Sequence, residues 1–240
     1  MNRRNFVVTA GLASLAGLAA GKLVLAGGAQ ATPDSGDAHD YLDFLNRSGG
    51  VAVAAGAPTA TSLVLPRSVS PTEPNIEGPF WRDHAPTRYT ITSPYEPGTM
   101  MVIRGRVWGY GTKAPIAGAA IHIWNADDKG RYDNDTDPAN PPAEFVNRGI
   151  IFSDAQGAYE YQTVHPGRYL NGNQYRPSHV HYMVFAPGYR KLTTQLYFKG
   201  DPYNGIDHFI RKSLIIDLQS QQRYSKTFES GVFDIVLRPI

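Results

Sequence analysis

From about residue 71 to its end, the chain alternates short strand-like segments with turns rich in Gly, Pro and Asp. The segments are rich in β-branched and aromatic residues, and the clearest are residues 101–108, 119–124, 158–163, 179–185 and 232–237. Helical character is confined to residues 39–47 and, ambiguously, 207–219. Many short strands at roughly regular spacing predict a mainly β fold, a β-sandwich or barrel, with few short helices.

The composition limits the chemistry that this fold can carry. Of the 240 residues, 42% are hydrophobic, which is enough for one good-sized core. The chain has no cysteine, so disulfides, thiolate metal sites and cysteine nucleophiles are excluded. Any bound metal must therefore use His, Tyr, Asp or Glu.

The first 31 residues have the features of an export signal. The sequence RRNFV at residues 3–7 resembles a twin-arginine motif, an uncharged run of 16 residues follows, and Ala-Gln-Ala at residues 29–31 offers a small-x-small cleavage site. We therefore expect residues 1–31 to direct export to the periplasm or the extracellular space by the twin-arginine route. Whether the segment is cleaved or kept as an anchor stays open, although 16 residues are short for a membrane span.

The charge of the remaining chain argues against polyanionic partners. Residues 1–31 carry three basic residues and no acid, so their removal takes the formal net charge from +2 to −1. A nearly neutral protein has no electrostatic basis for binding nucleic acid, or a membrane once the signal is removed. Residues 32–70 are rich in Ala, Gly, Pro and Ser and predict a linker or N-terminal arm, followed by the β domain at residues 71–240.

The densest chemical signal is the pair His179 and His181 within a strand-like segment. Residues i and i+2 of a strand share a face, so both imidazoles point the same way and could bind one metal ion. Met183 and Phe185 continue that face, so the histidines border an apolar region in which they need partners or a metal. An H-x-H pair is also an ordinary pair of sheet residues, and alone it does not decide between these interpretations.

A second candidate metal motif lies in the acidic segment at residues 133–144. Asp133, Asp135, Asp137 and Glu144 occupy positions 1, 3, 5 and 12 of an EF-hand-like calcium loop. Pro138 stands where such a loop needs glycine, and no helices flank the segment. We therefore expect a polar, solvated loop rather than a calcium site.

Five short motifs resemble, in the same order, those of the intradiol ring-cleavage dioxygenases of the catechol 1,2- and protocatechuate 3,4-dioxygenase type. They are PNIEGPF at residues 74–80, IWNADDKGRY at 123–132, PGRY at 166–169, RPSHVH at 176–181 and APGYRKLTTQ at 186–195. The resemblance covers roughly residues 71–240, which would then be a catalytic β-sandwich of that family. Several motifs in one order are much more specific than the H-x-H pair.

The resemblance implies a non-haem Fe(III) site with four protein ligands, Tyr132, Tyr169, His179 and His181. It implies that Tyr169 leaves the metal and accepts a proton when substrate binds, and that Arg176 and Gln195 orient the substrate. The implied partners are a catechol-type diol and O2, and the implied product is a cis,cis-muconate-type diacid, as in the catabolism of aromatic compounds. Two tyrosinates and two imidazoles suit a ferric ion, because hard oxygen donors stabilise the higher charge.

The sequence departs from these relatives in two respects. Only 9 residues separate Tyr169 from His179, and no long helical N-terminal domain precedes the β domain. The identity of the catechol and the oligomeric state therefore stay open, with a homo-oligomer among the options. Two other classes of function also stay open, a non-catalytic β-sandwich binding module and a divalent-metal hydrolase that uses the H-x-H pair.

Overall fold

The computed structural model describes residues 69–137, 139–223 and 225–240. The predicted export signal at residues 1–31, the predicted helix at 39–47 and almost all of the predicted arm at 32–70 lie outside this part, so they stay predictions. Among the described residues, no helix is long and apolar enough to cross a membrane.

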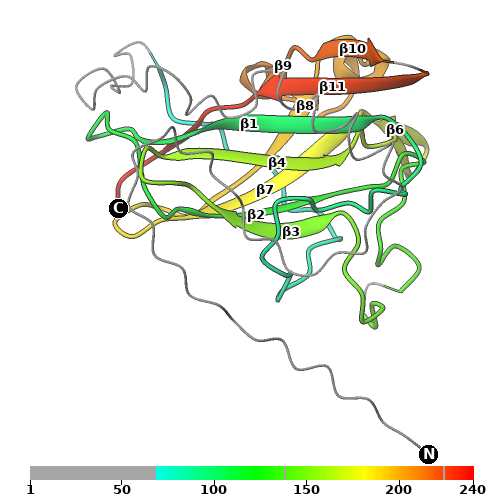
Figure 1. Ribbon diagram of the computed structural model, residues 1–240, viewed down its shortest axis with the longest axis horizontal. Coiled ribbons are helices and arrows are strands. Elements are labelled where there is room, and N and C mark those ends of the chain that lie inside the picture. Colours follow the sequence, from blue (N-terminus) through cyan, green and yellow to red (C-terminus); the bar gives the residue numbers. More distant parts are fainter. Residues whose placement is uncertain (1–68, 138, 224) are drawn as a thin grey trace, which may run out of the picture.

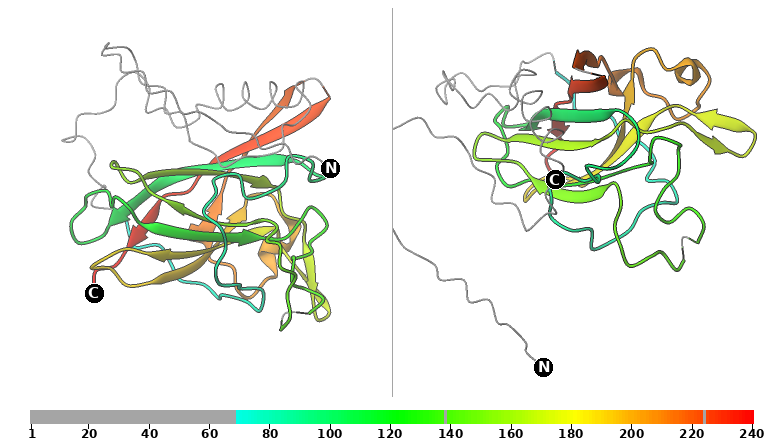
Figure 2. Two further views of the ribbon diagram at one scale, coloured as in Figure 1. Left: turned by 60° about the horizontal axis from the view of Figure 1, so that its bottom comes forward. Right: turned by 45° about the vertical axis from the view of Figure 1, so that its right-hand side comes forward.

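The first of two sheets is built around β1 (Met100–Gly109), which runs across the molecule in Figure 1. On one side β1 pairs antiparallel with β4 (Ala158–Val164), and on the other it pairs in parallel with β11 (Lys226–Val232) and then with β12 (Ile235–Leu237). β10 (Gln219–Arg223) pairs antiparallel with β11, and this pair extends from one end of the molecule in the left view of Figure 2.

The second sheet has five strands in the order β3, β2, β7, β8 and β9. Their bounds are Arg148–Phe152, Ala120–Asn125, His179–Phe185, Leu192–Phe198 and Ile215–Ile216. β5 (Tyr169–Asn171) and β6 (Gln174–Arg176) form a separate two-stranded hairpin at the edge of the molecule (Figure 2, right). The helical elements among the described residues are two 3-10 turns, η2 (Pro202–Gly205) and η3 (Lys212–Leu214).

The hydrophobic core lies between the two sheets. Along β7, Val180, Tyr182 and Val184 point inward and are completely buried. Ile103 of β1 and Tyr161 of β4 belong to the same cluster, and the hydroxyl groups of Tyr161 and Tyr182 hydrogen-bond across the core. Two packed sheets, each with both parallel and antiparallel pairs, together with the 3-10 turns confirm the predicted fold class, a mainly β sandwich with few short helices.

Four of the five predicted strands agree with the structure to within one residue at each end. The fifth, residues 232–237, is wrong as a single strand because β11 ends at Val232 and β12 begins at Ile235. Between them the backbone N–H of Phe233 donates to Arg104 O at 2.8 Å, and Asp234 Oδ1 accepts from Arg106 N at 2.8 Å. A Cβ at Gly105 would lie 1.9 Å from Phe233 O, so this crossing of two backbones requires glycine in β1.

The predicted helix at residues 207–219 is also wrong. The Asp207 carboxylate accepts from the backbone N–H of Phe209 in a turn, and only residues 212–214 form a short 3-10 helix. Ile215 and Ile216 then pair in parallel with the end of β8, and residues 219–223 form β10. Leu214 is buried in the core, and Ile215 and Ile216 are partly buried against it in their pairing with β8. This tertiary pairing overrides local helical spacing.

Candidate metal centre

His179 and His181 lie on the outer face of the second sheet, the face opposite the main core. Both side chains are buried, and they alternate along β7 with the inward-facing Val180 and Tyr182. The indole of Trp124, the cross-strand neighbour of His181 on β2, stacks on the His181 ring with centroids 4.8 Å apart and planes 8° apart. The strand period and this aromatic contact therefore fix both imidazoles on one side of a rigid sheet.

Tyr132 completes a close cluster of three donor atoms. The Nε2 atoms of His179 and His181 are 3.2 Å apart, and Tyr132 Oη lies 3.1 Å from His181 Nε2 and 3.5 Å from His179 Nε2. His179 Nδ1 is 2.6 Å from Pro177 O, and only a protonated Nδ1 can donate to this carbonyl. The Nε2 lone pair of His179 is thereby directed at the centre of the cluster.

Tyr132 is carried by the loop that follows β2, and a tight turn aims it at the histidines. Asp127 Oδ1 accepts from the backbone N–H groups of Lys129 and Arg131 at 2.9 and 2.8 Å, and Gly130 N donates to Asp127 O. The Tyr132 ring is then covered by Phe80, which stacks on it at a centroid distance of 4.2 Å.

Asp133, next to Tyr132, forms a buried ion-pair network. Its Oδ2 accepts from Arg82 Nη1 at 2.6 Å, and its Oδ1 accepts from Arg148 Nε at 2.6 Å. The side chains of Asp133 and Arg148 are each only 2% exposed, and that of Arg82 is 7% exposed. The expected solvated loop is therefore wrong at this residue, although Asp135 and Asp137 are exposed as predicted.

Tyr169 enters the cluster from the β5–β6 hairpin. Its ring lies edge-on to Tyr132 with centroids 5.9 Å apart, and it contacts His179 at 5.6 Å and Phe80 at 5.8 Å. The four predicted metal ligands are therefore gathered in one place, although they come from a loop, a hairpin and a strand.

A direct backbone contact joins the segments that carry the two tyrosines. A Cβ at Gly130 would lie 2.2 Å from Arg168 O, and one at Gly167 would lie 2.4 Å from Asp128 O. Gly167 N donates to Asp127 O at 2.7 Å across the same contact. The two segments meet without room for side chains, so the positions of the tyrosines are coupled.

The two predicted substrate-orienting residues contact each other within a buried polar network. Arg176 Nη2 donates to Gln195 Oε1 at 2.9 Å and to Tyr197 Oη at 3.0 Å, and Arg176 Nε donates to Asp207 Oδ2 at 2.8 Å. The Gln195 amide nitrogen donates to Ile76 O at 2.9 Å, which fixes the orientation of the amide group. The same Gln195 nitrogen lies 3.3 Å from His181 Nδ1, so all six predicted site residues lie in one continuous set of contacts.

Burial has opposite effects on the pKa values of the histidines and of Tyr132. Burial, with the positive charge of Arg176, lowers the pKa of His179 to about 3. Burial also holds the pKa of His181 well below its ordinary value, and both imidazoles are therefore neutral at pH 7. Burial raises the pKa of Tyr132 against the opposing charges of Arg176 and Arg148, so the protein alone does not form the phenolate.

These donors fit a ferric ion. Tyr132 Oη, His179 Nε2 and His181 Nε2 face one another in a buried space, and a cation could accept a lone pair from each. A trivalent ion would also provide the positive charge that the buried phenolate lacks. Among the described residues, no three His, Cys, Asp or Glu side chains are grouped so that they could hold a metal ion, so the described part of the chain offers the H-x-H pair no third ligand of these types.

Sequence reasoning missed four residues that support the centre, Phe80, Trp124, Tyr197 and Asp207. Tyr197 was detectable, because it follows Gln195 by two positions in a strand and so shares its face. Trp124 and Phe80 lay within recognised motifs, but nothing local indicated that they stack on ligands. Asp207 had no signal, because the predicted helix concealed the turn that carries it.

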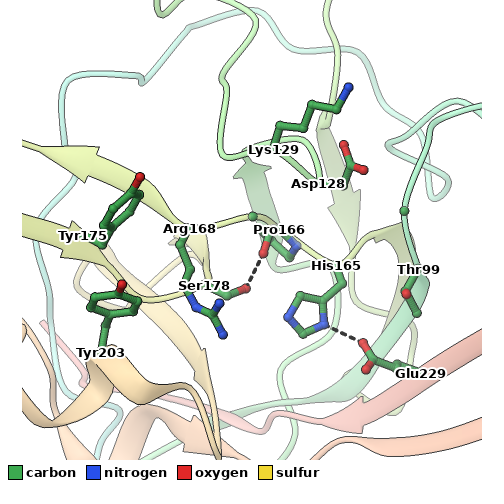
Figure 3. Close-up of a pocket in the computed structure, with 12 residues that line it drawn as sticks. Thr99, Asp128, Lys129, His165, Pro166, Arg168, Tyr175, Ser178, Tyr203 and Glu229 are labelled. Atoms are coloured by element: carbon green, nitrogen blue, oxygen red, sulfur yellow. Dashed lines mark hydrogen bonds and ion pairs between the residues drawn. The ribbon is translucent and has the colours of Figure 1, made fainter.

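A cleft of about 710 Å3 lies beside the centre and includes none of the six predicted site residues in its lining (Figure 3). Its wall includes Ser178, whose Oγ donates to Pro166 O at 2.6 Å. Ser178 precedes His179, and Pro166 leads into Tyr169. This contact therefore connects the chain segments that carry a histidine and a tyrosine of the centre.

Known proteins match this chain over the region that contains the centre. A family model described as Dioxygenase matches residues 76–239. The chain is 37% identical over 145 residues to catechol 1,2-dioxygenase 2 from Acinetobacter lwoffii, an alignment that covers 53% of this chain and about half, 51%, of that relative. It is 33% identical over 175 residues to the protocatechuate 3,4-dioxygenase beta chain from Burkholderia cepacia, covering 65% of this chain and 72% of the relative.

A solved structure extends the match to three dimensions. It is the dioxygenase domain of a dioxygenase carbohydrate-binding protein fusion from the cellulolytic bacterium Streptomyces sp. SirexAA-E. The two structures agree with a TM-score of 0.59 at 32% sequence identity, covering 71% of this chain and 100% of that domain.

Proposed function

The chain belongs to the intradiol ring-cleavage dioxygenase family, and we propose that it uses Fe(III) and O2 to open the ring of a catechol-type diol. The product would be a cis,cis-muconate-type dicarboxylic acid. The observation that carries this proposal is the convergence of Tyr132 Oη, His179 Nε2 and His181 Nε2 within 3.5 Å of one another, with the Tyr169 ring packed against them. A non-catalytic binding module would not require these rings to meet.

Tyr132, Tyr169, His179 and His181 would hold the ion. When bound, Fe(III) would draw electron density from the diolate and make the ring reactive towards O2. The buried ring of Trp124 and the partly buried ring of Phe80 cover His181 and Tyr132 and limit the access of water, which strengthens the charge interactions inside the site. The neutral imidazoles leave the acid–base steps to the phenols and to the substrate.

Tyr169 is the group best placed to accept a proton at its Oη. Its hairpin forms a two-stranded sheet of its own, and the Tyr169 side chain is only partly buried, whereas Tyr132 is 4% exposed. A phenol on a separate hairpin can move away from the centre with less disruption than one packed beneath Phe80. Deprotonation of the diol would then protonate Tyr169 as it withdraws.

Arg176 and Gln195 would orient the diol and stabilise negative charge on its ring. The Arg176 Nη1 atom is buried and has no hydrogen-bond partner among the described residues, so it is a donor that a substrate oxygen can satisfy. Gln195 is held by Arg176 and Tyr197 at its oxygen and by Ile76 O at its nitrogen. Both groups are thus oriented before substrate arrives.

The proposal can be tested on purified protein reconstituted with Fe(III). Tyrosinate-to-iron charge transfer should give a visible absorption band that shifts when catechol is added. O2 uptake with catechol, protocatechuate, chlorocatechols and hydroxyquinol should be stoichiometric with ring loss for at least one of them. Protein that stays colourless after loading, or that consumes no O2 with any of these diols, would refute the proposal.

Substitution of one ligand tests the assignment of the centre. Tyr132→Phe should weaken and shift the absorption band and remove most of the turnover, because one of the two tyrosinate oxygens is lost while the ring stays packed. Tyr110→Phe is the matched control, because Tyr110 is 39% exposed and lies outside the described centre. An unchanged band in the Tyr132→Phe protein would contradict the ligand assignment.

We also propose that residues 1–31 export the enzyme by the twin-arginine route. The support is the RRNFV sequence at residues 3–7 and the uncharged segment after it. Replacing Arg3 and Arg4 together by Lys should leave the protein in the cytoplasm of a bacterial host, as judged by cell fractionation. Export that persists in this variant would contradict the assigned route.

A further inference from the structure

Arg176 has one carboxylate partner among the described ion pairs, Asp207. Its Nε donates to Asp207 Oδ2 at 2.8 Å, and the two side chains are only 4% and 3% exposed. Its Nη2 donates to two neutral groups, Gln195 Oε1 and Tyr197 Oη, and its guanidinium also lies over the ring of Tyr169, with the central carbon 6.0 Å from the ring centroid. A buried guanidinium requires a partner of opposite charge, and among the described ion pairs Asp207 provides it.

The contacts of Arg176 determine which of its nitrogen atoms remains available. Nε is committed to Asp207, and Nη2 is shared between Gln195 Oε1 and Tyr197 Oη. Nη1 alone is buried without a partner among the described residues. The guanidinium is planar, so fixing Nε and Nη2 also fixes the direction of the Nη1 donors.

Asp207 is itself held firmly. Its Oδ1 accepts from the backbone N–H of Phe209 at 2.7 Å, and its own N–H donates to Tyr203 O at 3.1 Å. The Phe209 ring lies under the guanidinium of Arg176, with the central carbon 4.8 Å from the ring centroid. The turn that carries Asp207 thus provides both the counter-charge and an aromatic surface for Arg176.

We propose that Asp207 is a positioning residue, which acts through Arg176 and directs the Nη1 donor at the substrate oxygen that becomes negatively charged. This inference rests on the proposed function and extends it by one residue, because the contacts described for Asp207 are with Arg176, Tyr203, Phe209 and Ile210, and none is with a candidate ligand. Removal of the carboxylate leaves the guanidinium free to turn towards other acceptors. The donor would then be misplaced when charge develops on the substrate.

Asp207→Asn is the most informative substitution, because the amide oxygen can still accept from Phe209 N while the amide NH2 group faces Arg176 as a second donor. With iron-loaded protein we expect kcat to fall by about 10- to 100-fold and KM to change by less than about 3-fold, the pattern for a contact made mainly in the transition state. The charge-transfer band of the resting protein should be unchanged. Asp207→Glu, which keeps the charge, should recover part of the lost kcat, and Asp217→Asn, at an exposed ion pair, should behave as wild type.

A double-mutant cycle distinguishes positioning from a general structural role. If Asp207 acts only through Arg176, Arg176→Met and Arg176→Met/Asp207→Asn should have the same kcat. Additive losses in the double variant would overturn the proposal, as would an Asp207→Asn protein with wild-type kcat. Absence of the absorption band or of turnover in the unsubstituted protein would instead count against the proposed function.

A measurement on metal-free protein keeps the inference testable without turnover. The Nε–H proton of Arg176, bonded to a buried carboxylate, should exchange slowly and give its own NMR signal. In Asp207→Asn this signal should broaden or merge with those of exposed arginines, while in Asp217→Asn it should persist. An unchanged Arg176 signal in Asp207→Asn would overturn the proposal, whether or not iron binds.

Discussion

The candidate centre has two halves that are built in different ways. His179 and His181, the histidine half, stand two residues apart on β7 in the middle of a five-stranded sheet. Tyr132 and Tyr169, the tyrosine half, are carried by a loop and by a hairpin that pairs with neither sheet. The histidines are placed by the period of one strand, whereas the tyrosines are placed by contacts between distant segments.

This difference determines which changes should damage the centre and how. A substitution in the histidine half should remove a donor and leave the sheet intact, because backbone pairing with β2 and β8 does not need the imidazoles. A substitution in the contacts behind the tyrosine half should shift the tyrosines without removing either donor. A substitution in the histidine half should therefore lower iron affinity without lowering the stability of the metal-free protein. A substitution behind the tyrosine half should lower both.

The largest effect should come from His181→Ala. Loss of one of four donors should lower iron affinity and turnover by more than the roughly 10- to 100-fold that is usual for residues behind a ligand. The far-ultraviolet circular dichroism should stay that of the wild type, because β7 keeps its pairing on both sides. Iron content after loading, compared with that of His84→Ala at an exposed histidine, measures the effect. A His181→Ala protein that still binds iron as tightly as wild type would contradict the role of the histidine half.

The second effect concerns the tyrosine half. Asp133→Asn should reduce the free energy of unfolding by about 3–5 kcal/mol, because Arg82 and Arg148 would be left buried without their carboxylate. The loop that carries Tyr132 should loosen, so iron affinity should fall although no donor is lost. Urea unfolding of metal-free protein and iron titration measure the two changes.

An exposed ion pair provides the control for Asp133. In the pair of Lys199 and Asp217 the side chains are 71% and 63% exposed, so Asp217→Asn should cost less than about 1 kcal/mol. Equal losses of stability in the two variants would show that the buried network does not hold the tyrosine half.

The sequence predicted the histidine half well and the tyrosine half less fully, for the same structural reason. The strand at residues 179–185 has the predicted bounds, and a period of two is enough to put His179 and His181 on one face. Tyr132 and Tyr169 came from the family resemblance, since no local rule brings a loop and a hairpin together. The residues that hold these two tyrosines in place were missed because they act through contacts with distant parts of the sequence. The ion pairs of Asp133 with Arg82 and Arg148 are one example.

Contacts between distant segments also account for the two elements that were predicted wrongly. Residues 207–219 have apolar spacing that suits a helix, but pairing with the end of β8 draws Ile215 and Ile216 into a sheet. Residues 232–237 have strand character throughout, and their interruption is set by the crossing of Phe233 over Gly105. In both places the deciding contact lies in another part of the chain, so a local pattern could not contain it.

The third prediction uses pH to address the histidine half alone. Burial lowers the pKa of His179 to about 3 and also lowers that of His181, so the folded metal-free protein does not bind protons that the unfolded chain takes up below about pH 6.5. The contribution of the two neutral imidazoles to the free energy of unfolding is therefore fully present above that pH. It falls as the pH is lowered, by about 1.4 kcal/mol per pH unit for each imidazole. Urea unfolding of metal-free protein between pH 7 and pH 5 measures this slope.

A double variant isolates the two imidazoles from other groups. His179→Gln/His181→Gln should have a much shallower slope, because glutamine does not titrate. His122, whose pKa burial also lowers, is present in both proteins and cancels in the comparison. An equal slope in the two proteins would contradict the view that both ligands are buried in the neutral form.

The last prediction tests the contact that couples the two tyrosines. Gly130 and Gly188 have nearly the same positive φ, 81° and 82°, so alanine should cost each about 1 kcal/mol in backbone strain. A Cβ at Gly188 meets nothing within 4 Å, whereas one at Gly130 would lie 2.2 Å from Arg168 O. Gly130→Ala should therefore lose more stability in urea than Gly188→Ala, and it alone should alter the tyrosinate-to-iron band. If the two variants give the same band, the contact between Gly130 and Arg168 does not position the tyrosines, and Tyr132 and Tyr169 are held in place independently of each other.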